Sequence, residues 1–327
     1  MKWLSDDKLN YLRTIVANPD FSSTKYKFVK ELGRGGMGTV YLAEDRELNR
    51  LVAIKVLNTP EVTDDLRDRM IREAQIIARL EHPGIVPVHD VGTLPDGRVF
   101  YAMKYVRGSR LDEYAAQNSS FRDRLRKFQA ACDAVAFAHA HGVIHRDLKP
   151  QNIMIGSFGE VLVLDWGVAK IRDPLWSAAP WRRFGQSGGK PPHSKEASDT
   201  TEGTVIGTRD YMSPEQAQGE IDQLDERSDI YSLGAVLDFL LKDQRGVSKS
   251  AKAICLKATA RTKESRYSSV SELSADVGRL LDAEPVSAYR ENALEKVSRW
   301  VSKNRFLVLL VLAYLLMRIF FAFTARR

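Results

Sequence analysis

Residues 145–152, with the sequence HRDLKPQN, constrain this chain more than any other stretch. A carboxylate stands at Asp147, an ammonium two residues later at Lys149 and an amide five residues later at Asn152. The stretch lies between a helix-like run and a short apolar run. In such a turn the carboxylate could accept a hydroxyl proton, the ammonium could neutralise a transferring phosphoryl group and the amide oxygen could hold a hard cation. The alternative interpretation is a charged loop between a helix and a strand.

This stretch resembles the catalytic loop of protein kinases, whose signature runs H-R-D-L-x-x-x-N. The resemblance implies that Asp147 accepts the proton of a substrate hydroxyl and that Lys149 stabilises the γ-phosphoryl group transferred from ATP. Lys149 is similar to the lysine of the serine/threonine-specific branch, because tyrosine kinases usually carry a different pattern here. Small-molecule kinases of similar fold generally lack this lysine as well. On this resemblance, the substrate is a serine or threonine hydroxyl of a protein.

A glycine cluster near the N-terminus, residues 32–40 with the sequence LGRGGMGTV, contains G-x-G-x-x-G. Alone this pattern is weak, because a turn or a dinucleotide-binding fold would use the same glycines. Here it lies between two strand-like runs, and the sequence VAIK at 52–55 follows at the distance of the third kinase strand. Glycines let the backbone close over phosphates without a Cβ obstruction. The resemblance therefore implies that Lys55 contacts the α and β phosphates; a solvated strand lysine is the alternative.

Other positions of the nucleotide site follow from the same resemblance. Glu73, in a helical pattern over 64–80, resembles the glutamate that pairs with the strand lysine, here Lys55. Met103 corresponds to the gatekeeper, and the backbone of 104–106 corresponds to the hinge that binds adenine. The set implied for ATP is Leu32, Gly33, Gly35, Gly38, Val40, Ala53, Lys55, Glu73, Met103, Lys104 and Val106.

An apolar strand-like run over 161–164 ends in Asp165-Trp166-Gly167. This resembles the D-F-G metal motif with Trp in place of Phe. A large apolar ring still fills the aromatic position, so the resemblance implies that Asp165 and Asn152 hold Mg²⁺, with Mn²⁺ as an alternative ion. The Trp at this position affects how easily the ring moves between the packings of the active and inactive states.

The segment 165–215 is unusually long, and its part 177–204 is rich in Gly, Pro, Ser and Thr, which predicts mobility. The family places activating phosphates in this segment, and a phosphate there could pair with Arg146. The candidate phosphosites are Thr200, Thr201 and Thr204.

Four further residues have structural roles implied by the resemblance. Thr208 would hydrogen-bond near Asp147 and Lys149. Glu215, in a Ser-Pro-Glu element that matches A-P-E, would form an ion pair with Arg266. Asp229 would anchor the backbone of the catalytic loop.

Charge and cysteine content limit the partners and the compartment. The net charge of +7 comes without a long Lys/Arg block interleaved with aromatics, which indicates compatibility with membrane surfaces and phosphates and no nucleic-acid partner. Cys132 and Cys255 lie far apart in apolar helical patterns, which predicts buried, reduced thiols. The N-terminus lacks the apolar run of a signal peptide, so the body of the protein is expected in the cytosol.

Residues 306–323 are apolar except for Arg318. As a helix they would span about 27 Å, which suits a slightly thin bilayer; a buried core helix is the alternative. The preceding flank is basic at Lys296, Arg299, Lys303 and Arg305, which favours a cytosolic N-terminal side. The prediction is a single-pass anchor in the cell membrane with the kinase domain in the cytosol.

The predicted fold is a two-lobed α+β protein kinase fold with a β-rich N-lobe and a helical C-lobe. The C-lobe is shortened after Leu241, because only about ten residues separate it from the next helical pattern at 253, where relatives usually carry another helix that helps to dock protein substrates. The predicted organisation is an N-terminal helical extension at 1–25 with a short helix over 5–17, the kinase domain at 26–283, its N-lobe at 26–104, its C-lobe at 105–283, its activation segment at 165–215, a basic juxtamembrane linker at 284–305 and a transmembrane helix at 306–323.

The resemblance is specifically to membrane-anchored bacterial serine/threonine kinases of the eukaryotic-like type. The resemblance implies autophosphorylation, signalling from the membrane and protein substrates, and it is compatible with a homodimer. Two rival functions are open: a catalytically weak pseudokinase scaffold that binds ATP, and a small-molecule kinase. The missing helix, the altered metal motif and the long segment favour the scaffold, whereas Lys149 and the Ser-Pro-Glu element disfavour the small-molecule kinase.

Overall fold

The computed structural model of the 327-residue chain describes residues 19–35, 38–58, 64–117, 120–166, 170–171, 209–220, 223–242, 244 and 246–324. The predicted helix over 5–17, the candidate phosphosites Thr200, Thr201 and Thr204, and Thr208 lie outside the described residues.

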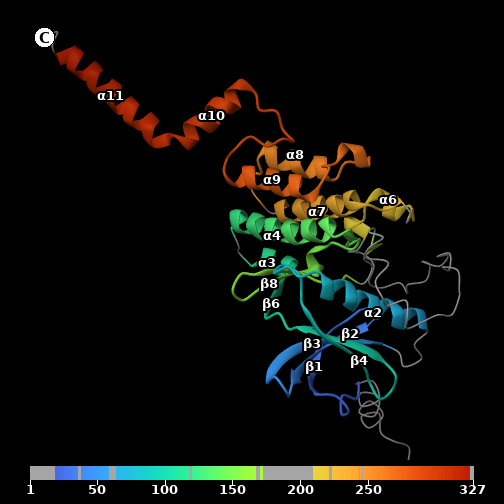
Figure 1. The fold of residues 1–327 in the computed structure, drawn as a ribbon. Helices are drawn as coiled ribbons and strands as arrows, with labels where there is room; N and C mark the ends of the chain where they lie inside the picture. Colours follow the sequence, from blue (N-terminus) through green and yellow to red (C-terminus); the bar gives the residue numbers. More distant parts are fainter. Residues whose placement is uncertain are drawn as a thin grey trace, which may run out of the picture.

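A five-stranded antiparallel sheet with the order β1-β2-β3-β5-β4 forms the N-lobe, and one long helix packs on it (Figure 1). Successive side chains of β5 point to opposite faces: Val99 and Tyr101 pack toward the helix, whereas Phe100 and Ala102 join a second cluster with Phe21. The small lobe thus begins its packing before residue 26. The elements are β1 (Tyr26–Arg34), β2 (Gly38–Asp45), β3 (Arg50–Leu57), α2 (Asp64–Arg79), β4 (Val88–Thr93) and β5 (Val99–Lys104).

Helices stacked on a long central helix build the C-lobe, and short strands at its edge toward the N-lobe carry the catalytic loop (Figure 1). Side-chain caps begin four of its helices: Ser120, Asp225, Ser248 and Ser269 each accept a backbone N–H of the first turn. The elements are β6 (Gly108–Arg110), α3 (Leu111–Ala116), α4 (Phe121–Ala140), β7 (Val143–Ile144), η1 (Pro150–Asn152), β8 (Ile153–Gly156), β9 (Val161–Val163), β10 (Lys170–Ile171), η3 (Arg209–Tyr211), α6 (Pro214–Ala217), α7 (Glu226–Leu241), α8 (Lys249–Ala258), η5 (Lys263–Ser265) and α9 (Val270–Leu281).

The connection between α7 and α8 is even shorter than predicted. Helix α8 begins at Lys249, four residues before the predicted position, because Ser248 caps it by accepting the Ala251 N–H. The described residues between the two helices, 242, 244 and 246–248, contain no further helix. A surface pocket of about 500 Å³ opens beside this connection, between η3, α7 and α8.

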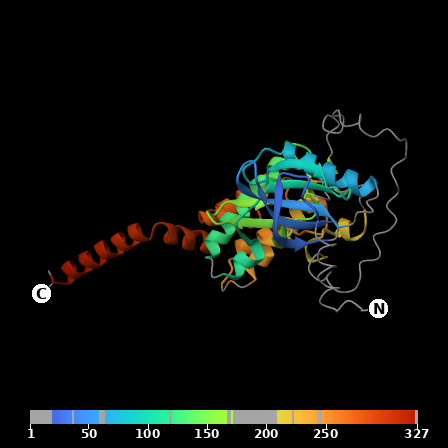
Figure 2. The same cartoon turned by 90° about the horizontal axis from the view of Figure 1, so that it is seen from below.

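The stretch predicted as a linker, 284–305, is largely ordered. Val286 is buried in the C-lobe core, and residues 293–303 form α10 (Ala293–Lys303), which is followed by α11 (Arg305–Thr324). Both helices project from the end of the C-lobe that lies away from the sheet (Figures 1 and 2). A capping box at Asn292 and Glu295 starts this helix. That 284–305 is a juxtamembrane linker stays a prediction.

The predicted transmembrane helix at 306–323 is not confirmed. Among the residues that the structure describes, no helix combines the length and the apolar character that a membrane span requires.

Candidate active site

A buried carboxylate on α7 anchors the catalytic loop. Asp229 is fully buried and accepts the backbone N–H groups of His145 and Arg146, each at 2.8 Å, while its Oδ2 lies 2.7 Å from His139 Nε2. Arg146 has φ +71°, a left-handed backbone conformation that Asp229 helps to hold. Burial alone would raise the pKa of Asp229, but the hydrogen bonds from His139 and the backbone lower it, so the anchor is ionised.

Within the loop, one carboxylate oxygen of Asp147 is held by two donors. Lys149 Nζ donates to Asp147 Oδ2 at 2.9 Å, and Asn152 Nδ2 donates to the same atom at 3.1 Å and to the Asp147 carbonyl at 2.7 Å. His145 supports the turn, because its Nδ1 accepts the Asp147 N–H at 3.3 Å and its Nε2 donates to the Leu164 carbonyl at 3.0 Å. The Oδ1 atom of Asp147 consequently has no donor among the described residues.

A second cluster joins the two lobes. Lys55 Nζ on β3 lies 2.8 Å from Glu73 Oε1 on α2 and 3.0 Å from Asp165 Oδ1, beyond the end of β9. Tyr101 donates its hydroxyl to the same Glu73 oxygen at 2.8 Å. Burial opposes the charge on Lys55, but Asp165 and Glu73 raise its pKa above the ordinary value.

Asp165 is the most exposed member of this cluster. Its side chain is 49% exposed and its φ is +61°, a strained conformation for a residue other than glycine. The surrounding protein opposes its ionisation, but the Lys55 ammonium lowers its pKa. Farther along the chain, β10 pairs antiparallel with β7, the strand that precedes the catalytic loop.

The glycine-rich turn between β1 and β2 is closed by backbone and side-chain bonds. A Cβ on Gly38 would lie 2.6 Å from the Val56 carbonyl oxygen, so a larger residue cannot occupy this position without moving β3. The Gly35 N–H donates to the Gly38 carbonyl at 2.9 Å. Asn58 ties the turn further, since it donates to the Gly35 carbonyl at 2.9 Å and accepts the Thr39 hydroxyl at 2.6 Å.

The remaining residues predicted for ATP lie on the strands of the same sheet. Val40 is paired with Lys55, and Ala53 with the half-buried Met103. Gly33 pairs with Val40 at the exposed end of β1, next to Leu32. Beyond β5, the Lys104 N–H already donates to the Pro87 carbonyl at 3.0 Å, and Val106 is buried.

The oxygens of Asp165 and Asn152 fit a hard divalent cation. The Asp165 carboxylate is ionised and half-exposed. Both hydrogen bonds of Asn152 leave from its nitrogen, so no described donor reaches its Oδ1. An ionised carboxylate and an amide oxygen are the ligands that Mg²⁺ and Mn²⁺ accept. The described residues contain no cluster of three or more His, Cys, Asp or Glu that could hold a metal.

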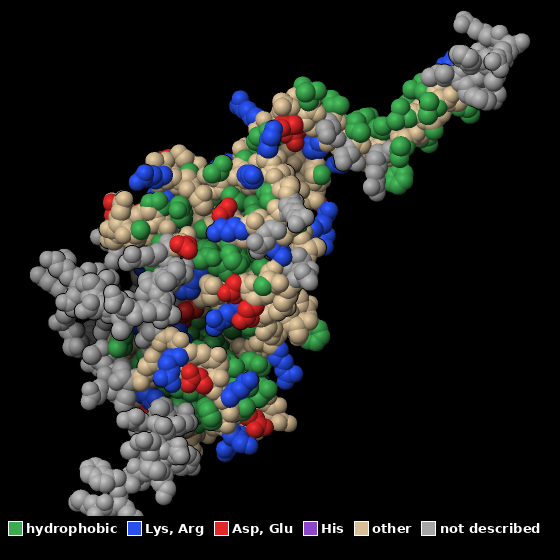
Figure 3. All heavy atoms as spheres, turned by 180° about the vertical axis from the view of Figure 1, so that it is seen from behind, with side chains coloured by type: hydrophobic (Ala, Val, Ile, Leu, Met, Phe, Trp, Pro, Cys, Tyr) green, Lys and Arg blue, Asp and Glu red, His purple; other side chains and the backbone are tan. Residues whose placement is uncertain are grey.

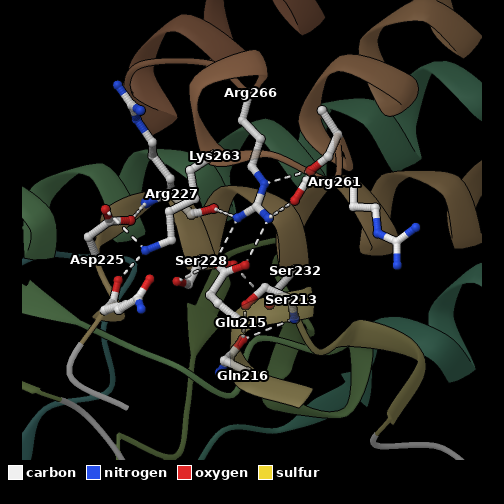
Figure 4. Close-up of polar contacts among 12 residues, drawn as sticks. Ser213, Glu215, Gln216, Asp225, Arg227, Ser228, Ser232, Arg261, Lys263 and Arg266 are labelled. Atoms are coloured by element: carbon white, nitrogen blue, oxygen red, sulfur yellow. Dashed lines mark hydrogen bonds and ion pairs between the residues drawn. The ribbon is translucent and has the colours of Figure 1, made fainter. Parts of the chain in front are cut away.

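The ion pair between Glu215 and Arg266 is sealed from solvent. Arg266 is 4% exposed and binds Glu215 through two parallel bonds, from its two terminal nitrogens to Oε1 and Oε2 at 2.8 and 2.9 Å (Figure 4). Its other three N–H groups donate to the carbonyls of Ala260, Arg227 and Arg261, so all five donors are satisfied. Burial would raise the pKa of Glu215, but Arg266 and Ser228 lower it to about 2.

Comparison with known protein families matches residues 26–284 to the protein kinase domain. This chain belongs to the protein kinase family. It is 38% identical over 231 residues to the serine/threonine-protein kinase PknD of Chlamydia muridarum, covering 65% of this chain and 24% of that protein. It is 35% identical over 306 residues to the serine/threonine-protein kinase PknB of Mycobacterium tuberculosis, covering 84% of this chain and 45% of that protein. The chain thus spans between a quarter and a half of these relatives.

Solved structures support the same fold. The crystal structure of the Mycobacterium tuberculosis PknI kinase domain aligns with a TM-score of 0.56 at 24% sequence identity, covering 78% of this chain and 96% of that chain. At this identity the match speaks for the two-lobed architecture alone.

Trp166 departs from the usual kinase motif in a way that the structure makes visible. The ring is 1% exposed and lies 4.6 Å from the His145 ring, centre to centre. Within the described part of the chain, its indole N–H has no acceptor. A buried donor without a partner destabilises the fold by about 1–3 kcal/mol. The apolar part of the ring thus fills the position of the family's Phe, while its polar atom is unsatisfied.

Several residues that support the site were not predicted from the sequence. Tyr101 and Asn58 contact the site through hydrogen bonds to Glu73 and Gly35, and His139 and Gln216 brace the loop through Asp229 and the Arg146 carbonyl. Each acts across elements that are distant in sequence. No local spacing could have revealed these contacts, whereas the catalytic motifs are local.

Proposed function

We propose that the protein is an ATP-dependent serine/threonine protein kinase that transfers the γ-phosphoryl group to protein hydroxyls. The observation that carries the proposal is that two charged clusters lie close together: Lys55 is bound to both Glu73 and Asp165, and Asp147 is bound to Lys149. His145 of the catalytic loop binds the Leu164 carbonyl next to Asp165, and Lys149 contributes to lowering the pKa of Asp165. Phosphoryl transfer depends mainly on positioning and on charge stabilisation. Each charged group that this chemistry needs is present and lies beside a partner.

Asp147 is the group that takes the proton. Its Oδ2 is occupied by Lys149 and Asn152, so Oδ1 is the oxygen that accepts the substrate hydroxyl. As the bond from the hydroxyl oxygen to phosphorus forms and the bond to the β-phosphate oxygen breaks, the hydroxyl proton moves to Asp147. Lys149, which donates to the other carboxylate oxygen, Oδ2, is placed to stabilise the charge on the transferred group.

The nucleotide is held between the sheet and the loop. Lys55 binds the α and β phosphates, and Glu73 and Tyr101 fix the direction of its ammonium group. Because Pro87 already accepts the Lys104 N–H, the hinge contacts to adenine fall to the Lys104 carbonyl and the Val106 N–H. A divalent cation held by Asn152 and Asp165 would neutralise the phosphates of ATP.

The test is phosphate transfer from radiolabelled ATP with Mg²⁺ by the full chain, to itself and to a generic basic protein, followed by acid hydrolysis to identify the labelled residue. Labelled phosphoserine or phosphothreonine is expected, and Asp147→Asn should lower the rate by about 10²–10⁴-fold with ATP affinity retained. ATP binding without transfer would instead support the scaffold. Labelling of sugars or aminoglycosides but of no protein would support a small-molecule kinase.

Autophosphorylation is part of this proposal. Thr200, Thr201 and Thr204 are the proposed sites, and Arg146 is the proposed partner of the phosphate, because the catalytic loop holds it in a fixed backbone conformation beside Asp147. Mass spectrometry of the labelled protein checks this assignment. Label found only outside 200–204 would contradict it.

We also propose that the chain signals from the cytosolic face of the cell membrane, held there by α11. Large apolar side chains of α11 are exposed on several sides, including Leu309 at 60%, Leu310 at 70% and Leu316 at 66%, and a basic stretch precedes them. Full-length protein should pellet with membranes after lysis and require detergent for release. Recovery in the supernatant without detergent would contradict this localisation.

A further inference from the structure

Helix α10 carries an apolar face that nothing in the described part of the chain covers. Its residues follow the three- and four-residue spacing of one helix face, and Figure 3 shows apolar surface along this projecting part of the molecule. The exposed fractions are 81% for Leu294, 59% for Val297, 55% for Trp300 and 38% for Val301.

The opposite face of α10 is bound back to the kinase domain. Glu295 accepts from Lys249 of α8 at 2.8 Å and from the Tyr289 hydroxyl at 3.0 Å. Arg299 pairs with Glu291 at 3.0 Å. The apolar face of the helix is therefore turned away from the domain to which it is attached.

The segment that leads into α10 is clamped by one buried carboxylate. Asp276 of α9 accepts the Ser287 N–H at 2.8 Å, the Ser287 hydroxyl at 2.7 Å and the Ala288 N–H at 3.1 Å. Tyr267 and Arg279 bind the same carboxylate at 2.9 and 2.6 Å. Because the segment cannot swing freely, α10 keeps a defined direction relative to the C-lobe.

We propose that α10 lies along an anionic lipid surface, with Leu294, Val297 and Trp300 in the headgroup region, and that the Asp276 clamp fixes how the kinase domain stands on that surface. Amphipathic helices with a Trp on the apolar face and basic neighbours bind in this way. The inference rests on the proposed membrane localisation and is independent of the proposed catalytic activity.

The charges around α10 favour a lipid surface over a protein partner. The three acidic residues nearest the helix each have a basic partner: Glu284 with Lys303 at 3.6 Å, Glu291 with Arg299, and Glu295 with Lys249. The exposed Lys296 lies at the edge of the apolar face, where its stem can extend to phosphate groups. Helix α11, which follows α10 after Asn304, also exposes large apolar side chains.

One geometric consequence follows. Because α10 leaves the end of the C-lobe opposite the sheet, a lipid surface under α10 holds the N-lobe outermost (Figure 1). The cleft between the lobes then stands at a constant height above the surface. Substrates presented at that height, including membrane proteins with a cytosolic tail, are favoured.

The test uses the full chain reconstituted into vesicles of phosphatidylcholine alone or mixed with phosphatidylglycerol, with bromine placed high on the acyl chains. Bromine quenches tryptophan fluorescence only at short range. The emission of Trp300 is obtained as the difference between wild type and Trp300→Phe. We expect most of this emission to be lost in the anionic vesicles and less in the neutral ones.

Two matched variants test whether the quenching of Trp300 depends on the apolar face of α10. Val297→Asp places a charge on the exposed face and should abolish the quenching of Trp300, while vesicle flotation is kept by α11. Leu256→Asp makes the same change at a 72% exposed position of α8 and should leave the quenching intact.

Protein that floats with vesicles while Trp300 stays unquenched would overturn the lipid contact of α10 and leave the membrane localisation standing. Quenching that survives in Val297→Asp would also overturn it. Protein that does not float would overturn both. Phosphate transfer by the same preparations reports separately on the catalytic proposal.

Discussion

Two networks of this kinase domain are both built from ion pairs, but they differ in how far they are exposed to solvent. The Arg266–Glu215 pair is sealed: the side chains are 0% and 7% exposed, and every guanidinium donor has an acceptor. The Lys55–Glu73–Asp165 network is open at one end, because the Asp165 side chain is 49% exposed. The sealed pair has no capacity left for a ligand and holds the fold together. The open network has an ionised carboxylate that is exposed to solvent, so a ligand can bind it.

The largest effect is expected from breaking the sealed pair. Arg266→Met leaves Glu215 charged and buried, so the free energy of unfolding should fall by about 3–5 kcal/mol. Urea denaturation measures this. Replacing both partners by apolar residues, Arg266→Met with Glu215→Leu, should recover part of the loss, because no buried charge is left behind. A double variant that is less stable than the single one would contradict the sealed-pair interpretation.

Acid should weaken the same pair. The pKa of Glu215 is about 2 in the folded protein and 4.5 in its ordinary state. A lowered folded pKa contributes stability that is fully present above pH 4.5 and is lost as the pH falls toward 2. Between pH 6 and pH 3 the free energy of unfolding of the wild type should therefore fall by roughly 2 kcal/mol more than that of Glu215→Gln. Parallel curves would show that Glu215 is not the titrating group.

A smaller effect is expected in the open network. Tyr101→Phe removes the hydroxyl that Glu73 accepts, while Lys55 still binds Glu73. The free energy of unfolding should fall by about 1–2 kcal/mol, because the bond is made to a charged acceptor. ATP affinity should weaken modestly, since Glu73 is oriented less strictly. Titration of ATP into both proteins checks this, and unchanged affinity and stability would assign Tyr101 no role.

The smallest effect tests a buried polar group that belongs to neither network. Trp166→Phe removes an indole N–H for which the described residues provide no acceptor, and it leaves a smaller ring, so the gain and the loss in stability partly cancel. The free energy of unfolding should change by less than about 1 kcal/mol, whereas Trp166→Ala should lower it by about 3–5 kcal/mol. A large loss in Trp166→Phe would show that the indole nitrogen is satisfied in solution.

Local motifs made the catalytic residues predictable. Lys55, Asp147, Asn152 and Asp165 stand in short stretches whose spacing carries their chemistry, and the structure pairs Lys55 with Asp165 and Asn152 with Asp147. The bracing residues are different, because Tyr101, Asn58 and His139 act through side-chain bonds across the fold.

The region after α9 shows a second limit of sequence reasoning. It reads as a basic linker, yet Asp276 clamps it and a capping box starts α10. A single buried carboxylate that binds two backbone N–H groups and a hydroxyl of the segment leaves no periodic signal in the sequence. The amphipathic spacing of α10 was present in the sequence and could have been found by examining 293–303 as a helix.

One measurement tests most directly whether the open network is catalytic and the sealed pair structural. The isosteric variants Asp165→Asn and Glu215→Gln are compared in phosphate transfer per folded molecule and in urea unfolding. Asp165→Asn should keep the stability of the wild type and lose at least about 10²-fold in transfer, because the amide cannot stabilise the cation and the phosphates. Glu215→Gln should lose stability and keep transfer. Transfer at the wild-type rate in Asp165→Asn would contradict the assignment of the open network as the catalytic one.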